Sequence, residues 1–165
     1  MIFGKINEYS NKNTSILSFC EKIAEENNVK NGGALHFSNV LKSCNIIFCF
    51  ENKNKIIGYV GLKNYNCFEK TIYIEQLCVS KKHTRNKVAT RLLKKAELYC
   101  IKNNIRFLIA NVRKENLPSN GLFQSLNYMP YDMSDLEYKT LGFKMKDIIF
   151  NNAYKKELDM NGIID

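Results

Sequence analysis

The spacing of hydrophobic residues changes several times along the chain, and each change predicts a different structural element. In residues 14–28 hydrophobic side chains recur every three or four positions, which is the period of an amphipathic helix. Thr14 or Ser15 is expected to cap its start, because a hydroxyl oxygen accepts a hydrogen bond from the first helical amides. A second, shorter helix is predicted over residues 34–43.

Residues 46–79 have the composition and alternation of β-strands instead. IIFCF (46–50) and IIGYVGL (56–62) are joined by the short polar segment ENKNK, so we predict a β-hairpin. A third strand is predicted for TIYIEQLCV (71–79), in which the charged Glu75 interrupts an otherwise apolar pattern.

A helical period returns at residue 88. Apolar residues with lysines between them predict an amphipathic helix over 88–103, with its apolar face made of Val88, Leu92, Leu93, Ala96, Leu98 and Ile101. RFLIANV (106–112) is predicted to be a buried strand, and a strand–helix–strand order of this length implies a parallel pair with a crossover. A short helix near 118–126 and two strands in the last forty residues complete the prediction.

This order is an antiparallel meander that leads into one βαβ unit, so we predict an α/β fold of the mixed-sheet, α+β kind. At 165 residues and 19.2 kDa the chain is expected to be a single domain over residues 1–165.

No apolar run approaches the roughly 20 residues of a membrane span, and the first residues lack the layout of a secretory signal. We therefore expect a cytoplasmic monomer or homodimer that does not bind membranes.

The charge and the cysteines change this picture little. The net charge is +9, but the basic residues are mostly scattered lysines, and Lys, Asn and Ile rise together in proteins from A+T-rich genomes. Nucleic acid is therefore disfavoured as a partner. The six cysteines form no CxxC pair and are expected to be buried, reduced thiols. With only His36 and His83 in addition, no metal site is predicted.

Two segments resemble the motifs of the GNAT family of N-acetyltransferases. IEQLCVSKKHTRNKVATRLL (74–93) is similar to the family's strand ending in L-x-V, its turn R/Q-x-x-G-x-G/A and the helix that follows. VRKENLPSNGLFQSLNY (112–128) is similar to V-x-x-x-N-x-x-A-x-x-L-Y-x-x-L-G-F, with matches at Val112, Asn116, Ser119, Leu122, Phe123, Leu126 and Tyr128. Some resemblance to diamine acetyltransferase-like members lies in the YIE and NLPS segments.

This resemblance implies the acyl-CoA N-acyltransferase fold, in which the parallel strand pair splays apart. It also implies an acetyl-CoA-dependent enzyme that moves an acetyl group directly to a primary amine in a ternary complex. The amine belongs to a small molecule or a peptide. The backbone of Leu77, Cys78 and Val79 would then hold the pantetheine arm and polarise the acetyl carbonyl. Asn116, Ser119 and Phe123 would line the other side of the arm.

The turn before residue 88 has a physical reason to bind phosphate. A helix N-terminus presents unpaired amides and the positive end of a dipole, so it binds anions without particular side chains. We expect the pyrophosphate of coenzyme A to bind amides of this turn, with a hydroxyl from Thr90 and a charge from Arg85 or Lys87. The predicted phosphate-binding residues are Arg85, Asn86, Lys87, Val88, Ala89 and Thr90.

Glu75 is the predicted general base, because related acetyltransferases use a glutamate at this position to take the ammonium proton. Two positions depart from the family pattern. Phe123 stands where the family has a tyrosine that protonates the thiolate, so the acid is open between Tyr128, Tyr131, Tyr138 and water. Lys87 stands where the family has glycine, and it is costly there if its φ is positive. These departures support an alternative, a catalytically weak protein that binds acyl-CoA or a partner.

Overall fold

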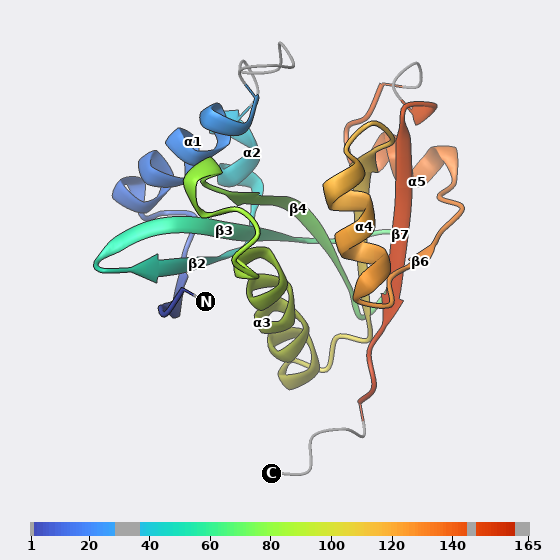
Figure 1. The fold of residues 1–165 in the computed structure, drawn as a ribbon. Helices are drawn as coiled ribbons and strands as arrows, with labels where there is room; N and C mark the ends of the chain where they lie inside the picture. Colours follow the sequence, from blue (N-terminus) through green and yellow to red (C-terminus); the bar gives the residue numbers. More distant parts are fainter. Residues whose placement is uncertain (1, 29–36, 145–147, 161–165) are drawn as a thin grey trace. The chain divides into compact units, whose positions relative to one another are not determined.

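The computed structural model describes residues 2–28, 37–144 and 148–160 (Figure 1). Its elements, in chain order, are β1 (Lys5–Tyr9), α1 (Thr14–Asn28), α2 (Phe37–Ser43), β2 (Ile46–Asn52), β3 (Lys55–Asn64), β4 (Thr71–Val79), a 3₁₀ turn (Lys81–His83), α3 (Val88–Lys102), β5 (Phe107–Arg113), α4 (Leu117–Ser125), β6 (Met129–Pro130), α5 (Asp135–Thr140) and β7 (Asn151–Glu157). Within the described residues, each helix is too short or too polar to cross a bilayer.

The chain divides into two compact units. The first contains Met1–Lys63 and Ile74–Tyr99, and the second contains Asn64–Tyr73 and Cys100–Asp165. β4 belongs to both, because its first three residues lie in the second unit and the rest lie in the first.

In the first unit the strand order is β1-β2-β3-β4. β1 pairs antiparallel with β2, and β2 pairs antiparallel with β3. The predicted hairpin is confirmed: Lys53 and Asn54 form its two-residue turn, with φ of 46° and 62°. Positive φ at both turn residues matches the right-handed twist of the two strands.

Helix α1 covers the core of the first unit. Leu17, Cys20, Ile23 and Ala24 are buried at the predicted helical spacing and pack in one cluster with Tyr59 of β3. The predicted cap is wrong by one residue. Asn13 caps the helix, since its Oδ1 accepts a hydrogen bond from the Ile16 amide at 3.2 Å and its carbonyl accepts one from Leu17.

Helix α3 buries most of the predicted face, but Ile101 is half-buried and Leu98 is exposed. Val88, Leu92, Leu93 and Ala96 are buried, whereas Leu98 is 50% exposed, so its assignment to that face was wrong. Two residues after Ala96 a helix has turned by about 200°, which points Leu98 away from the buried face.

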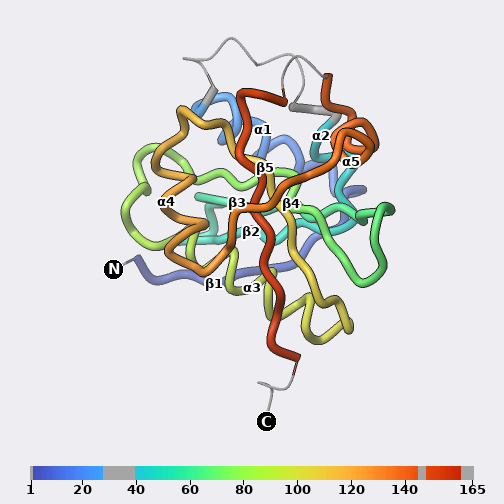
Figure 2. The backbone as a smooth tube through the Cα atoms, turned by 90° about the vertical axis from the view of Figure 1, so that its right-hand side faces the viewer, coloured from blue at the N-terminus to red at the C-terminus, as the bar shows by residue number. Residues whose placement is uncertain are grey.

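In the second unit β7 is the central antiparallel partner. It pairs with β5 along its whole length and with β6 at Met129 and Pro130 (Figure 2, red). The first residues of β4 are next to β5 in the strand order, and α3 connects these two strands. A strand–helix–strand crossover makes them the predicted parallel pair in a mixed sheet.

Most predicted elements are present near their predicted bounds. Helix 14–28 and strand 71–79 coincide with α1 and β4. Of the helix predicted over 34–43, the structure describes α2 from Phe37 to Ser43, and residues 34–36 lie outside the described part. The strand β1 and the helix α5 were missed. The six cysteines, all within the described residues, form no disulfide, and Cys67 and Cys78 are half-buried rather than buried.

Candidate functional site

The burial of β4 changes along its length. Its first four residues are buried, whereas its last five, from Glu75 to Val79, are half-buried. The hydrophobic segment predicted to hold the pantetheine arm, Leu77–Val79, is therefore partly open to solvent. A half-exposed strand end leaves backbone groups accessible to a ligand that pairs with them as an added strand would.

The turn after β4 is held by its own side chains. The Thr84 hydroxyl donates to the Lys81 carbonyl at 3.1 Å, and Asn86 Nδ2 donates to the Thr84 carbonyl at 3.0 Å. Arg85 and Lys87 both have positive φ, at 61° and 59°. Lys87 therefore adopts the left-handed conformation for which the family pattern uses glycine, and this costs a non-glycine residue about 1–2 kcal/mol.

Helix α3 begins directly from this left-handed residue. The Lys87 carbonyl accepts the first helical hydrogen bond, from the Arg91 amide at 3.0 Å, so Lys87 is the N-cap. A lysine side chain has no acceptor atom and cannot cap the amides of the first turn. The amides of residues 87–90 have no acceptor within the helix and are available to an anion.

Gly58 of β3 allows the strand end and the helix start to pack closely. A Cβ atom at this position would lie 2.9 Å from Val88 Cγ1 and 3.1 Å from the Cys78 carbonyl oxygen. Any larger residue would push on α3 or on β4. Val88 is buried, while Ala89 and Thr90 beside it are half-buried.

Glu75 is a shielded carboxylate with one nearby cation. Its side chain is 15% exposed, and its Oε2 lies 3.9 Å from Lys63 Nζ. Within the described residues that buried oxygen has no hydrogen-bond partner. Burial raises the pKa of Glu75, and the charge of Lys63 opposes part of this shift. A carboxylate with a raised pKa is a stronger base than an exposed one.

In the second unit Asn116 is the N-cap of α4. Its Oδ1 accepts a hydrogen bond from the Ser119 amide at 3.2 Å, and its side chain is exposed. Phe123 is 3% exposed, with its ring stacked at 5.7 Å on Tyr154 and perpendicular at 5.0 Å to Tyr128. Phe123 is thus part of a packed aromatic cluster, and its contact with a coenzyme stays a prediction.

Sequence reasoning missed Asn120, which holds the loop that carries Asn116. Its buried Nδ2 donates to the carbonyls of Arg113 at 2.9 Å and Asn116 at 2.8 Å. Its Oδ1 accepts hydrogen bonds from Asn152 Nδ2 and the Tyr154 hydroxyl. No motif marks this residue, because the two side chains that donate to it, Asn152 and Tyr154, lie on β7, far along the chain.

The three tyrosines left open as acids differ in their surroundings. Tyr128 and Tyr138 are 1% and 5% exposed. The half-buried Tyr131 donates its hydroxyl to Glu137 Oε1 at 2.7 Å, and burial together with this carboxylate raises the pKa of Tyr131. Tyr65 donates to the same oxygen at 2.6 Å. None of the three is thereby identified as the acid.

Glu137, which was also missed, is a buried carboxylate with several donors. Burial acts to raise its pKa, but hydrogen bonds from Tyr65, Ser134 and Tyr131 outweigh this effect and the pKa lies below its usual value. Ser134 and Glu137 form a capping box at the start of α5. The S-x-x-E signature at 134–137 was the available signal for it.

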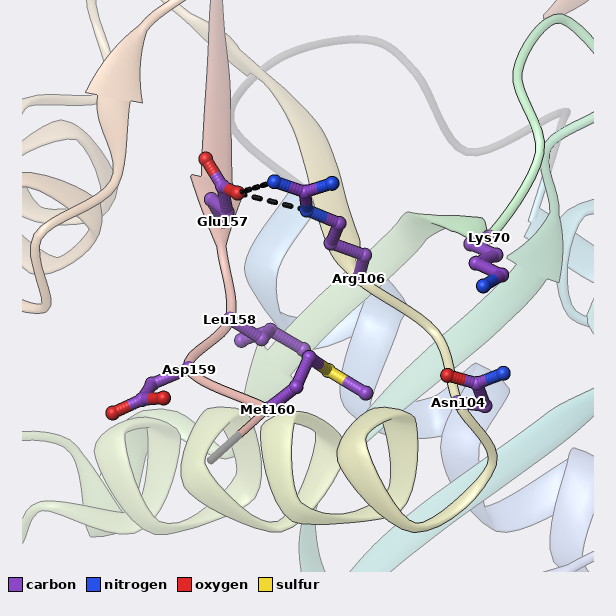
Figure 3. A pocket seen from close by; sticks show the side chains of 7 residues that line it. All are labelled: Lys70, Asn104, Arg106, Glu157, Leu158, Asp159 and Met160. Carbon is purple, nitrogen blue, oxygen red and sulfur yellow. Dashed lines mark hydrogen bonds and ion pairs between the residues drawn. The ribbon is translucent and has the colours of Figure 1, made fainter. Parts of the chain in front are cut away.

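A pocket of about 620 Å³ in the second unit does not contain the predicted site (Figure 3). It is lined by Lys70, Asn104, Arg106, Glu157, Leu158, Asp159 and Met160. Arg106 Nε donates to Glu157 Oε1 at 2.8 Å across its wall, and both side chains are more than half exposed. The pocket is therefore an open surface feature with a solvated ion pair.

The predicted site residues fall into two sets. The first unit brings together Glu75, the strand end 77–79 and the turn 85–90. The second unit brings together Asn116, Ser119 and Phe123 on one short helix and its cap.

The chain matches the family model described as the acetyltransferase (GNAT) family over residues 15–128. No curated protein matches its sequence.

Several solved structures have the same fold. An acetyltransferase of the GNAT family from Staphylococcus aureus Mu50 is 18% identical, with a TM-score of 0.71 and coverage of 95% of this chain and 100% of that chain. The ribosomal-protein-S18-alanine N-acetyltransferase from Escherichia coli is 14% identical, with a TM-score of 0.68 and coverage of 99% of both chains. The PaiA N-acetyltransferase from Thermoplasma acidophilum, in complex with coenzyme A, is 11% identical, with a TM-score of 0.68 and coverage of 94% of this chain and 99% of that chain.

Proposed function

The chain belongs to the acetyltransferase (GNAT) family, and we propose that it moves an acetyl group from acetyl-CoA to a primary amine by direct transfer in a ternary complex. The observation that carries this proposal is the start of α3. There a left-handed Lys87 leads into a helix whose first amides have no internal acceptor. The PaiA N-acetyltransferase, which has the same fold, is in complex with coenzyme A.

The residues of the first unit fit coenzyme A. Amides of the turn 85–90 would bind its pyrophosphate, and Arg85 or Lys87 would add a charge that strengthens these hydrogen bonds. The half-buried Leu77–Val79 would hold the pantetheine arm by backbone pairing, as an added strand does. When bound, acetyl-CoA supplies an activated acetyl thioester.

Glu75 would take the proton of the acceptor ammonium, directly or through a water molecule. A neutral amine is the nucleophile, so the base must be ionised at the working pH and still basic enough to accept the proton. Shielding from water and the nearby Lys63 provide such a balance, because they shift the pKa of Glu75 in opposite directions. A backbone amide of the strand end would stabilise the charge on the acetyl oxygen.

From the second unit, Asn116, Ser119 and Phe123 would contact the arm. Phe123 has no acidic proton, so a tyrosine among Tyr128, Tyr131 and Tyr138, or water, would protonate the thiolate.

The acceptor would be a small-molecule or peptide amine, and the weaker resemblance to diamine acetyltransferases stays a prediction. We expect a cytoplasmic enzyme that acts as one domain over residues 1–165, as a monomer or homodimer.

The proposal is tested by following acetyl-CoA consumption over amino acids, amino sugars, diamines and peptides. With the best acceptor, Glu75→Gln should lower kcat about 100-fold, because general bases contribute on this order, and should leave acetyl-CoA affinity nearly unchanged. Glu25→Gln, at an exposed position on α1, is the matched control and should retain full activity.

Unchanged turnover in Glu75→Gln would remove Glu75 from the base role. Saturable acetyl-CoA binding without turnover of any amine would favour the alternative, a catalytically weak protein that binds acyl-CoA. The replacement of the family's tyrosine by Phe123 is the observation that favours this alternative.

A further inference from the structure

The last turn of α1 carries an asparagine whose side chain contacts the end of β4. Asn27 Nδ2 donates to the Val79 carbonyl at 3.0 Å and to the Ile23 carbonyl of its own helix at 2.8 Å. A carboxamide nitrogen has two hydrogens, and these two carbonyl oxygens use both. The partners also fix the orientation of the amide, because its oxygen could not accept from either of them.

The peptide unit that follows Val79 is held from both sides. Its carbonyl accepts the hydrogen bond from Asn27, and its N–H, which belongs to Ser80, donates to the Ile57 carbonyl of β3 at 2.9 Å. A peptide unit is planar, so two hydrogen bonds at opposite ends fix the direction of the whole plane. The Ser80 hydroxyl adds a third contact, the second one to α1, since it donates to Glu26 Oε2 at 3.0 Å.

This peptide unit sits where the regular strand ends. Val79 is the last residue of β4, and the chain turns into a 3₁₀ helix at Lys81. Without the Asn27 contact, the Val79 carbonyl would lose this donor, and the peptide unit would be held only through the Ser80 contacts with Ile57 and Glu26. The direction in which Leu77–Val79 present their backbone groups therefore depends on a side chain of α1.

We propose that Asn27 is a positioning residue for coenzyme binding, which locks the peptide unit after Val79 so that the strand end is ready to pair with the pantetheine arm. This inference rests on the proposed function, because it takes Leu77–Val79 as the segment that binds the arm. Asn27 itself acts through the strand and does not contact the coenzyme.

A comparison of two ligands distinguishes a positioning role of Asn27 from a general effect of Asn27 on the stability of the protein. The phosphate-binding turn at 85–90 and the strand end at 77–79 would bind different parts of coenzyme A. Adenosine 3′-phosphate 5′-diphosphate contains the phosphates without the arm. Removal of Asn27 should therefore weaken binding of coenzyme A while leaving binding of this fragment unchanged.

The experiment measures the Kd of both ligands by titration calorimetry at a temperature well below the melting transition of every variant. We expect Asn27→Ala to bind coenzyme A about 10-fold more weakly, as for the loss of one half-buried hydrogen bond, and the fragment equally well. Asn27→Asp should lose more, because a carboxylate has no hydrogen to donate and would face two carbonyl oxygens.

Asn11→Ala is the matched control. Asn11 also donates its side-chain amide to a backbone carbonyl in the first unit, that of Lys42 at 2.9 Å, but far along the chain from the β4 end. It should change neither Kd. If Asn27→Ala does not fold, Asn27→Gln, which moves the same amide by one methylene, is measured with both ligands instead and should show the same selective loss for coenzyme A.

The possible outcomes distinguish the positioning role of Asn27 from the proposed function of the protein. If the wild-type protein binds neither ligand, the proposed function itself is wrong. If it binds both and the Asn27 variants lose nothing, or lose both ligands equally, the positioning role is wrong while the proposed function stands. A selective loss for coenzyme A confirms the role.

Discussion

The backbone φ angle of Lys87 is unusual for a residue that is not glycine. Its φ of 59° is the left-handed conformation that glycine adopts without cost, and here a lysine adopts it. Natural proteins tolerate such strain where function requires it. At Lys87 the turn that is predicted to bind phosphate thus has the left-handed conformation for which the family pattern uses glycine.

Relief of this strain can be measured. Lys87→Gly should raise the free energy of unfolding by about 0.5–1 kcal/mol, because the gain from removing the left-handed strain exceeds the entropy that glycine adds to the unfolded chain. Urea denaturation measures the change. Lys82→Gly is the control, since Lys82 lies inside the 3₁₀ turn, where glycine should be destabilising. A loss of stability in Lys87→Gly would contradict the strain.

The Lys63–Glu75 pair predicts a shift in the pH dependence of the reaction. Burial raises the pKa of Glu75 and Lys63 lowers it, so Lys63→Met should raise that pKa further. A general base acts only when deprotonated. The rising limb of kcat/KM against pH should therefore move to higher pH, and activity on the acid side of that limb should fall.

Cys44, on which the charge of Glu75 also acts, does not disturb this prediction. Burial, with a smaller effect from Glu75, raises the pKa of Cys44 to about 12, so its thiol stays neutral across the measured range. Lys63→Arg should restore the wild-type limb. Lys55→Met, which removes an exposed lysine from the same strand, should leave it unmoved. An unshifted limb in Lys63→Met would show that the pair does not control the base.

Among the elements, the start of α3 was the most predictable part of the site. The change from a strand to a helical period at residues 79–88 is visible in the local pattern, and anion binding at a helix N-terminus is a property of the backbone. Neither required knowledge of the tertiary fold. The end of the strand was less predictable, because its exposure and its support by Gly58, Ile57 and Asn27 depend on other elements.

Ala89 tests whether this helix start binds phosphate. Ala89→Trp places a large ring in the first turn of α3, where the half-buried methyl group leaves room for a ligand. It should abolish binding of coenzyme A, as measured by calorimetry. Leu98→Trp, at an exposed position of the same helix, is the control and should bind normally. Retained binding in Ala89→Trp would refute the phosphate-turn assignment.

At the level of the whole molecule, the order of elements was enough to predict the mixed sheet and the βαβ crossover. The two elements that were missed are short: β1 has five residues and α5 has six. Elements of this length show little periodicity, and they form because tertiary contacts support them. Glu137, for example, gains hydrogen bonds from Tyr65 and Tyr131 in addition to its capping box.

The local sequence is sufficient for most element types, the family motifs and the start of α3 after the strand, because periods of two and 3.6 residues and helix-end chemistry depend on neighbouring residues alone. Only the tertiary structure shows which residues contact the predicted site residues. Asn27 and Val79 are 52 positions apart, and Lys63 and Glu75 lie on different strands. No local pattern specifies such pairs. They are set by how α1 and β3 pack against the end of β4, and that packing determines which carboxylate is shielded and which peptide unit is locked.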